Sequence, residues 1–402
     1  MRGGFAVGAL AGALVLMATA GCSGPAKAEG GTGGGGGAGS SATATPPKPT
    51  VSAATIAIEP ANGTVDVKPS GTVKVTAAGG KLTSVKVTGP DGTQVPGALT
   101  ADGTGWAPGG PLLVGTAYTV DALAEDAQGV VVNARSSFTT LTPEKDAGVS
   151  DNIADNETYG VGMIVSVNFD RAVKNKDAVL AGIAFETSDG TKVKGHWFSD
   201  KRLDFRPENY WNANTKVTIH YKLKNVETAP GVYGGVDKDE PFAIGRSQVS
   251  TTDAATHRMT VFRDGQQVDD IPITAGKPGF DTWSGIMVVE AKEGTTRMTS
   301  NGITKEGSGD EYDLVVPHAM RLTDSGTYVH GNSWTGSKIG RSNESHGCIG
   351  VTDTKTGSPS TDAGKLYDST LVGDVFKVVN SKSDQVSPSN GLSGWNLPWA
   401  QW

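Results

Sequence analysis

Short runs of alternating apolar and polar residues dominate residues 51–142 and 143–250 and restrict what this part of the chain can fold into. Runs such as "GTVKVTA" and "KVTIHYKLKNV" repeat every two residues, and turn dipeptides such as Asn62-Gly63 separate them. Period-2 runs interrupted by turn residues about every ten residues are typical of a β-sandwich. The pattern therefore predicts a mainly β protein that begins with two tandem immunoglobulin-like β-sandwiches.

Residues 251–380 form a third region with its own pattern. The stretch "HRMTVFRDGQQVDDIPITAG" alternates on both sides of a turn at Asp264, which predicts a hairpin. A helical pattern follows over residues 361–369, with Ser360 or Thr361 as its N-cap. We therefore expect a β-rich domain with one short helix.

The last residues, 381–402, contain the tryptophan-rich segment "GLSGWNLPWAQW". Trp395, Trp399 and Trp402 carry large apolar rings, and burying such rings stabilises a fold strongly. We expect this C-terminal extension to pack on the domain that precedes it.

The N-terminus resembles an export signal. Its apolar run, residues 5–18, is shorter than the roughly 20 residues that span a bilayer. "ATA" fits ordinary secretion, whereas "TAGC", which ends at Cys22, resembles a bacterial lipoprotein box, and we favour the second. We predict a signal peptide over residues 1–22, lipidation of Cys22, and a flexible Gly- and Pro-rich tether over residues 23–50, which lacks the apolar residues needed to order it.

The charge pattern gives no indication of a nucleic-acid partner. Lysine and arginine number 35 and aspartate and glutamate 42, for a formal net charge of −7. Both signs are spread along the chain, whereas nucleic-acid binding calls for a basic face or stripe.

Cys348 is the only cysteine after Cys22, so an exported chain carries one free thiol. A thiol with an ordinary pKa of about 8.5 needs a neighbouring base to act as a nucleophile near neutral pH. His346 lies two residues before it, but His330, from a separate strand, is the better candidate. The N–H groups of Gly347 and Cys348 are candidate oxyanion donors. A glycine at position 347 is equally typical of an ordinary turn.

A zinc site is the metal alternative. It would use His318, His330, His346 and Cys348, whose spacings match none of the usual zinc patterns. We therefore expect no metal at this site.

The segment "VHGNSW…SNESHGCIGV", Val329 to Val351, resembles the catalytic signature of the L,D-transpeptidases, the YkuD-type cysteine enzymes of bacterial peptidoglycan. Their pattern is His-Gly or His-Ser, a spacer, and then Ser/Thr-His-Gly-Cys. In papain-like and NlpC-type peptidases the cysteine comes first instead. The two sandwiches and the tryptophan-rich extension also resemble actinobacterial members, so the resemblance covers nearly all of the mature chain.

The resemblance implies a role for each matching residue. Cys348 would be the nucleophile and His330 its base, the carbonyl of Gly331 would orient the imidazole, and His346 would support the thiol. Gly350 stands where the family usually carries Asn or Arg. The predicted substrate contacts are Tyr312, Ser325, Gly326, Trp334, Ser345 and Gly350.

The implied reaction is acyl transfer without a metal or organic cofactor. Cys348 would attack the third, diamino-acid residue of a peptidoglycan tetrapeptide stem and expel D-alanine, and a neighbouring stem would then form a direct cross-link between third residues. Carbapenems would acylate Cys348, and the enzyme would face the cell wall from a lipid anchor in the cell membrane. Two alternatives stay open: an L,D-carboxypeptidase, with water as acceptor, or a non-catalytic peptidoglycan-binding scaffold.

Overall fold

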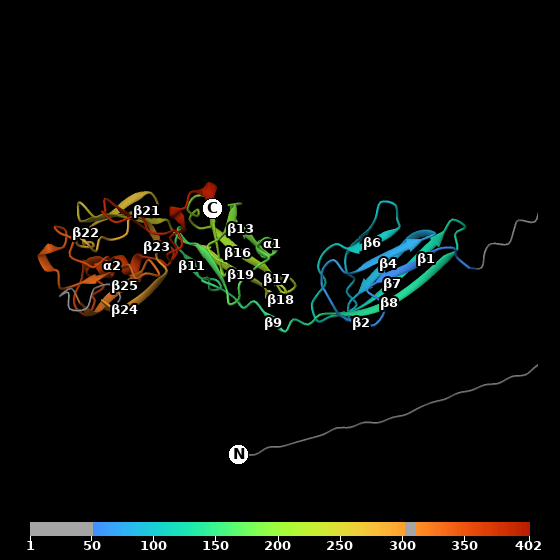
Figure 1. Cartoon of the computed structure of the whole chain (residues 1–402). Coiled ribbons are helices and arrows are strands. Elements are labelled where there is room, and N and C mark those ends of the chain that lie inside the picture. The colour runs from blue at the N-terminus through green and yellow to red at the C-terminus, as the bar shows by residue number, and fades with distance from the viewer. Residues whose placement is uncertain (1–50, 302–310) are drawn as a thin grey trace, which may run out of the picture. The chain divides into compact units, whose positions relative to one another are not determined.

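The computed structural model describes residues 51–301 and 311–402 (Figure 1). The predicted signal peptide, lipidation at Cys22 and tether lie outside these residues. The mainly β fold is confirmed, because strands far outnumber the two α-helices in the described part of the chain. Among the helices described, none is both long and apolar enough to span a bilayer.

The first domain is a sandwich of two four-stranded sheets. One sheet contains, in spatial order, β1 (Thr55–Glu59), β3 (Lys74–Ala78), β6 (Gly105–Pro108) and β5 (Gly97–Leu99). The other contains β2 (Thr64–Val67), β8 (Val131–Thr140), β7 (Ala117–Asp126) and β4 (Gly80–Thr88). Alternate residues of β7 are buried, so the period-2 pattern of the sequence directs one face of the strand into the core.

The second domain repeats this plan and adds a helix. One sheet contains β10 (Val149–Asp151), β12 (Val165–Phe169), β15 (Arg202–Pro207) and β14 (Val193–Trp197). The other contains β11 (Thr158–Tyr159), β19 (Asp237–Ile244), β16 (Lys216–Lys222) and β13 (Ile183–Thr187). A small sheet is formed by β9 (Lys145–Asp146), β18 (Val232–Tyr233) and β17 (Glu227–Ala229). Helix α1 (Lys176–Ala181), which the sequence analysis did not predict, precedes β13.

The third domain is built on a nine-stranded sheet. Its strands, in spatial order, are β23 (Gly285–Val288), β28 (Val375–Val379), β20 (Gln248–Asp253), β21 (Arg258–Arg263), β22 (Gln266–Thr274), β27 (Ile349–Thr352), β26 (Tyr328–Asn332), β25 (Asp313–Arg321) and β24 (Ala291–Thr299). The predicted hairpin is confirmed as the antiparallel pair β21 and β22. The predicted helix is confirmed as α2 (Asp362–Ser369), whose N-cap Thr361 accepts a hydrogen bond from the Gly364 N–H at 3.2 Å.

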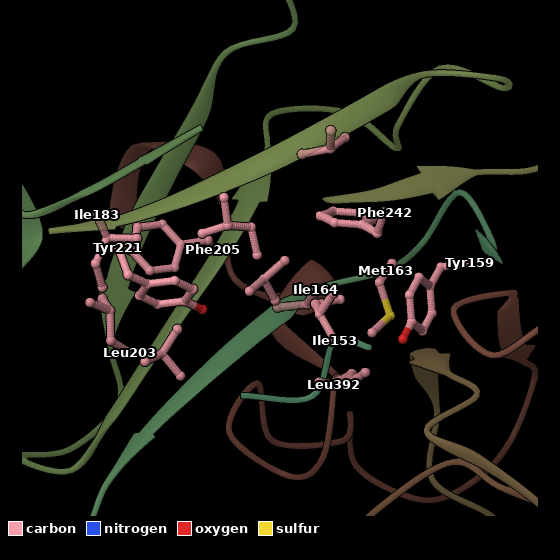
Figure 2. Close-up of a cluster of buried hydrophobic side chains, with 14 of the residues drawn as sticks. Ile153, Tyr159, Met163, Ile164, Ile183, Leu203, Phe205, Tyr221, Phe242 and Leu392 are labelled. Atoms are coloured by element: carbon pink, nitrogen blue, oxygen red, sulfur yellow. The ribbon is translucent and has the colours of Figure 1, made fainter. Parts of the chain in front are cut away.

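The C-terminal extension contains two 3-10 turns, η2 (Gly394–Asn396) and η3 (Trp399–Gln401), and contacts both neighbouring domains. Trp395 Nε1 donates to the Gly162 carbonyl at 2.7 Å, and Trp402 Nε1 donates to the Lys194 carbonyl at 2.8 Å. Both rings pack on the core of the second domain, in the same cluster as Leu392, Ile153 and Met163 (Figure 2). We expected the extension to pack on the third domain, and its tryptophan rings lie instead against the second.

Contacts with the third domain come from polar groups of the same extension. Asn396 Oδ1 accepts from the Ile286 N–H at 2.8 Å, and its Nδ2 donates to the Ile286 carbonyl at 2.6 Å. The Leu392 N–H donates to Glu290 Oε1 at 3.0 Å. Burial first, and then the charge of Asp324, raise the pKa of Glu290 to about 7.

Deleting residues 391–402 should lower the melting temperature, because the deletion exposes the apolar surface that the indole rings cover. The single change Trp402→Ala should cost about 3–5 kcal/mol of unfolding free energy, since this ring is only 4% exposed. Trp283→Ala is the control, because Trp283 is 37% exposed and should cost much less. Equal melting temperatures for the full and shortened chains, measured by calorimetry, would contradict this account of the extension.

Glu290 should make the unfolding free energy depend on pH. Its pKa in the folded chain, about 7, lies above its ordinary value of 4.5, so the folded state holds the extra proton between these values. Stability should therefore fall by about 2–3 kcal/mol as the pH rises from 4.5 to 7. Glu290→Gln keeps the acceptor for Leu392 but cannot ionise, and urea unfolding at pH 5 and pH 8 should show a smaller decline for this variant. Identical declines in both proteins would show that Glu290 is not the group responsible.

Candidate active site

The parallel pair β26 and β27 places the predicted base and the predicted nucleophile on one face of the nine-stranded sheet. His330 lies opposite Gly350 in the register of this pair. Cys348 lies in the bend immediately before β27, two residues before Gly350. The side chains of His330 and Cys348 accordingly line the same cavity.

This cavity has a volume of about 300 Å³. Its lining includes six side chains that the sequence analysis named: Tyr312, His330, Trp334, Ser345, His346 and Cys348. It also includes five that the analysis did not name: Met298, Leu314, Val316, Asn332 and Glu344. The sequence could have indicated three of these five residues, because residues two apart on a strand share a face. Leu314 and Val316 follow Tyr312 at intervals of two, and Asn332 follows His330 at the same interval.

The imidazole of His330 is held in one tautomer. Its Nδ1 lies 2.9 Å from the Gly331 carbonyl oxygen, and because a carbonyl can only accept, Nδ1 carries the hydrogen. Burial lowers the pKa of His330, so the ring is neutral near pH 7 and its Nε2 is a proton acceptor. The indole of Trp334 stacks on this ring, with centroids 5.7 Å apart and planes inclined by 15°.

The thiol of Cys348 is free and points at a backbone carbonyl. Its Sγ lies 3.7 Å from the Gly326 oxygen, a distance suited to a weak S–H hydrogen bond. Burial raises the pKa of Cys348 to about 11. The group is therefore a neutral thiol near pH 7, and it needs a base when it attacks.

His346 lines the same cavity as Cys348 and packs against two aromatic rings. Its ring meets Phe280 edge-on, with centroids 4.8 Å apart, and lies 5.0 Å from the ring of Tyr312. Aromatic packing of this kind restricts a side chain to one orientation. This histidine thus forms part of a packed wall of the cavity.

The backbone before Cys348 forms a tight turn. Gly347 has φ +116°, a conformation that other residues rarely adopt. Its N–H donates to Ser345 Oγ at 3.2 Å, and Ser345 Oγ donates to the Cys348 carbonyl at 2.6 Å. Of the two N–H groups expected to bind an oxyanion, that of Gly347 is thus bonded to Ser345 in this structure.

Close neighbours surround the two glycines at positions 331 and 350. A Cβ atom on Gly331 would lie 2.1 Å from Asp353 Oδ2, and one on Gly350 would lie 2.7 Å from Asn332 Nδ2. Asn332 lines the cavity, whereas Gly350, Ser325 and Gly326, all expected as substrate contacts, do not. Gly350 instead leaves room for the Asn332 side chain, whose Oδ1 accepts from the Trp334 and Thr335 N–H groups at 3.2 and 3.0 Å.

Of the histidines considered for a zinc site, His318 lies apart from His330 and His346. His318 Nδ1 lies 2.7 Å from Asp353 Oδ2, and His318 does not line the cavity. Within residues 51–301 and 311–402, no group of three or more His, Cys, Asp or Glu side chains is arranged to hold a metal ion.

Comparison with known proteins agrees with this architecture. Residues 64–227 match the model of a bacterial Ig domain, and residues 247–379 match that of the L,D-transpeptidase catalytic domain. The chain is 30% identical over 342 residues to L,D-transpeptidase 2 of Mycobacterium tuberculosis, a match that covers 85% of this chain and 82% of that relative. The chain belongs to the L,D-transpeptidase family.

Other L,D-transpeptidases show the same relationship. L,D-transpeptidase 5 of Mycobacterium tuberculosis is 28% identical, over 87% of this chain and 76% of its own length. A solved structure of the L,D-transpeptidase LdtMt1 in complex with imipenem is 30% identical, covers 58% of this chain and 99% of that one, and has a TM-score of 0.49. The predicted family and the predicted order of domains, Ig-like and then catalytic, are confirmed.

Replacing Gly350 by asparagine should destabilise this L,D-transpeptidase. The new Cβ would displace Asn332 and Thr274, whose Cγ2 would lie 2.9 Å away, and such overpacking costs about 1–3 kcal/mol. Gly110→Asn is the control, because nothing lies within 4 Å of a Cβ at that position. Chemical denaturation compares the two, and a Gly350→Asn variant as stable as the control would refute the packing argument.

Proposed function

We propose that the chain cross-links peptidoglycan through a thioester formed on Cys348. The observation that best supports this proposal is that a neutral thiol and a neutral imidazole line one cavity, with His330 Nδ1 bonded to the Gly331 carbonyl. A thiol whose pKa is raised to about 11 is a poor nucleophile until a base removes its proton. His330 Nε2 is the proposed base, and it accepts the proton as the sulfur attacks.

In the first half of the reaction, Cys348 Sγ attacks the carbonyl carbon of the third residue of a tetrapeptide stem. The thiol proton passes to His330 Nε2, and the same proton passes on to the nitrogen of the departing D-alanine. The carbon–nitrogen bond breaks and a thioester remains. The Gly331 carbonyl stabilises the imidazolium that forms between the two transfers, because it accepts from Nδ1–H.

In the second half, the side-chain amine of a neighbouring stem attacks the thioester. His330 removes a proton from the amine and returns it to the sulfur, which leaves as the thiol. The product is an amide between two third residues. The Cys348 N–H is a proposed donor to the oxyanion at both steps, and each such donor is worth about 3 kcal/mol of the barrier.

Carbapenems are the proposed covalent inhibitors, as suggested by the solved relative in complex with imipenem. Opening of the lactam by Cys348 would give an acyl-enzyme of the same kind as the substrate thioester. We also propose that the chain is exported and anchored by a lipid on Cys22. Residues 23–50 would then connect the anchor to the Ig-like domains and let the catalytic domain reach the cell wall.

Incubation with a disaccharide-tetrapeptide should yield a cross-linked dimer with the wild type and no product with Cys348→Ala. His330→Ala should slow the reaction about 10²- to 10⁴-fold, since the proposed general base is lost. Mass spectrometry reads both the products and the mass added to the protein by imipenem.

The products also separate the alternatives. Tripeptide alone would indicate an L,D-carboxypeptidase, in which water resolves the thioester. No product, together with no imipenem adduct on folded protein, would overturn the enzymatic proposal and favour a peptidoglycan-binding scaffold.

A further inference from the structure

The turn between β25 and β26 carries the carbonyl that the Cys348 thiol contacts. This turn closes on itself, because the Gly326 N–H donates to the Thr323 carbonyl at 3.1 Å and the Thr327 N–H donates to Thr323 Oγ1 at 2.9 Å. Gly326 itself has φ +92°. The carbonyl of Gly326 then lies 3.7 Å from Cys348 Sγ. Any displacement of the turn therefore moves a group that touches the reactive sulfur.

The C-terminal extension holds this turn from outside the cavity. Asn390 Oδ1 accepts from the Ser325 N–H at 3.1 Å, and Asn390 Nδ2 donates to Ser325 Oγ at 2.9 Å. The next residue, Gly391, donates its N–H to Asp324 Oδ2 at 3.1 Å. Two adjacent residues of the extension thus make three hydrogen bonds to two adjacent residues of the turn.

The second Ig-like domain fixes the extension at the same place. Arg202, on β15, donates to the carbonyls of Ser389 and Gly391, one on each side of Asn390. Its guanidinium is bidentate to the carboxylate of Asp204, at 2.9 and 2.7 Å, and that side chain is fully buried. A planar guanidinium held at both ends has little freedom, so the backbone around Asn390 is anchored to the second domain.

The third domain also contacts this part of the extension. Gly391 has φ +65°, and a Cβ there would lie only 1.6 Å from Glu290 Oε1. The following residue, Leu392, is 5% exposed and belongs to the core of the second domain (Figure 2). The extension therefore crosses the turn in one closely packed conformation.

We propose that Asn390 is a positioning residue for Cys348, acting through Ser325 and the carbonyl of Gly326. Asn390 does not line the cavity, so it has no direct contact with a substrate bound there. Its two hydrogen bonds keep the Gly326 carbonyl against the S–H group and hold the sulfur in one orientation. Arg202 makes this support depend on the second Ig-like domain. The proposal rests on the proposed function, in which Cys348 is the nucleophile.

The experiment measures acylation of the full chain by imipenem over a range of imipenem concentrations. Asn390→Ala should lower the saturating rate constant about tenfold, the effect expected from the loss of two hydrogen bonds. The half-saturating concentration should stay unchanged, because Asn390, Ser325 and Gly326 all lie outside the cavity lining. Asn390→Asp should restore most of the rate, since a carboxylate can accept from both the N–H and the hydroxyl of Ser325.

Asn396→Ala is the matched control. Asn396 lies on the same extension and makes two hydrogen bonds to Ile286, but none to the turn. This variant should lose stability and still acylate at the wild-type rate constant when fully folded. Arg202 is unsuitable for the test, because its removal leaves the buried carboxylate of Asp204 without its charged partner.

Two results would overturn the inference: a wild-type rate constant in Asn390→Ala, or an equal fall in Asn396→Ala, which would indicate general loosening. Failure of the proposed function gives a different result. In that case wild-type protein itself would form no adduct, so no rate constant would exist to compare.

Discussion

The site depends on the parallel pairing of β26 with β27. This register sets His330 opposite Gly350 and brings Cys348 to the same face, at one cavity. Burial suppresses the charged forms of both groups, because it lowers the pKa of the imidazole and raises that of the thiol to about 11. Proton transfer must then accompany the attack. The relative orientation of the two side chains therefore matters more than a thiolate formed in advance.

Orientation of this kind needs support from behind the cavity, and several elements supply it. Asp353 fills the space next to Gly331, and the rings of Phe280 and Tyr312 hold His346. The C-terminal extension binds the turn that carries Gly326. Much of the support for the proposed nucleophile therefore comes from residues that have no contact with the cavity, including Arg202 of the Ig-like domain.

The sequence predicted those features that depend on local pattern. Alternation identified the sandwiches and the hairpin, and Thr361 identified the start of α2, because each signal lies within a few residues. Helix α1 was not predicted, because a helix of six residues without a side-chain cap gives little signal in the sequence. The pairing of Asn390 with Ser325 could not be foreseen, since 65 residues separate them and neither belongs to a periodic run. The space that Asn332 takes beside Gly350 likewise depends on sheet register, which alternation alone does not encode.

A ribosome makes a chain from its first residue to its last, and domains fold in that order. Cys348 thus emerges before Asn390 and the tryptophans that follow, while the Gly326 turn is still without its outer hydrogen bonds. The outer hydrogen bonds of this turn can form only after Asn390 and Gly391 have been added to the chain. A product that ends between Cys348 and Asn390 would carry the whole catalytic motif and still lack the segment that is proposed to align the thiol.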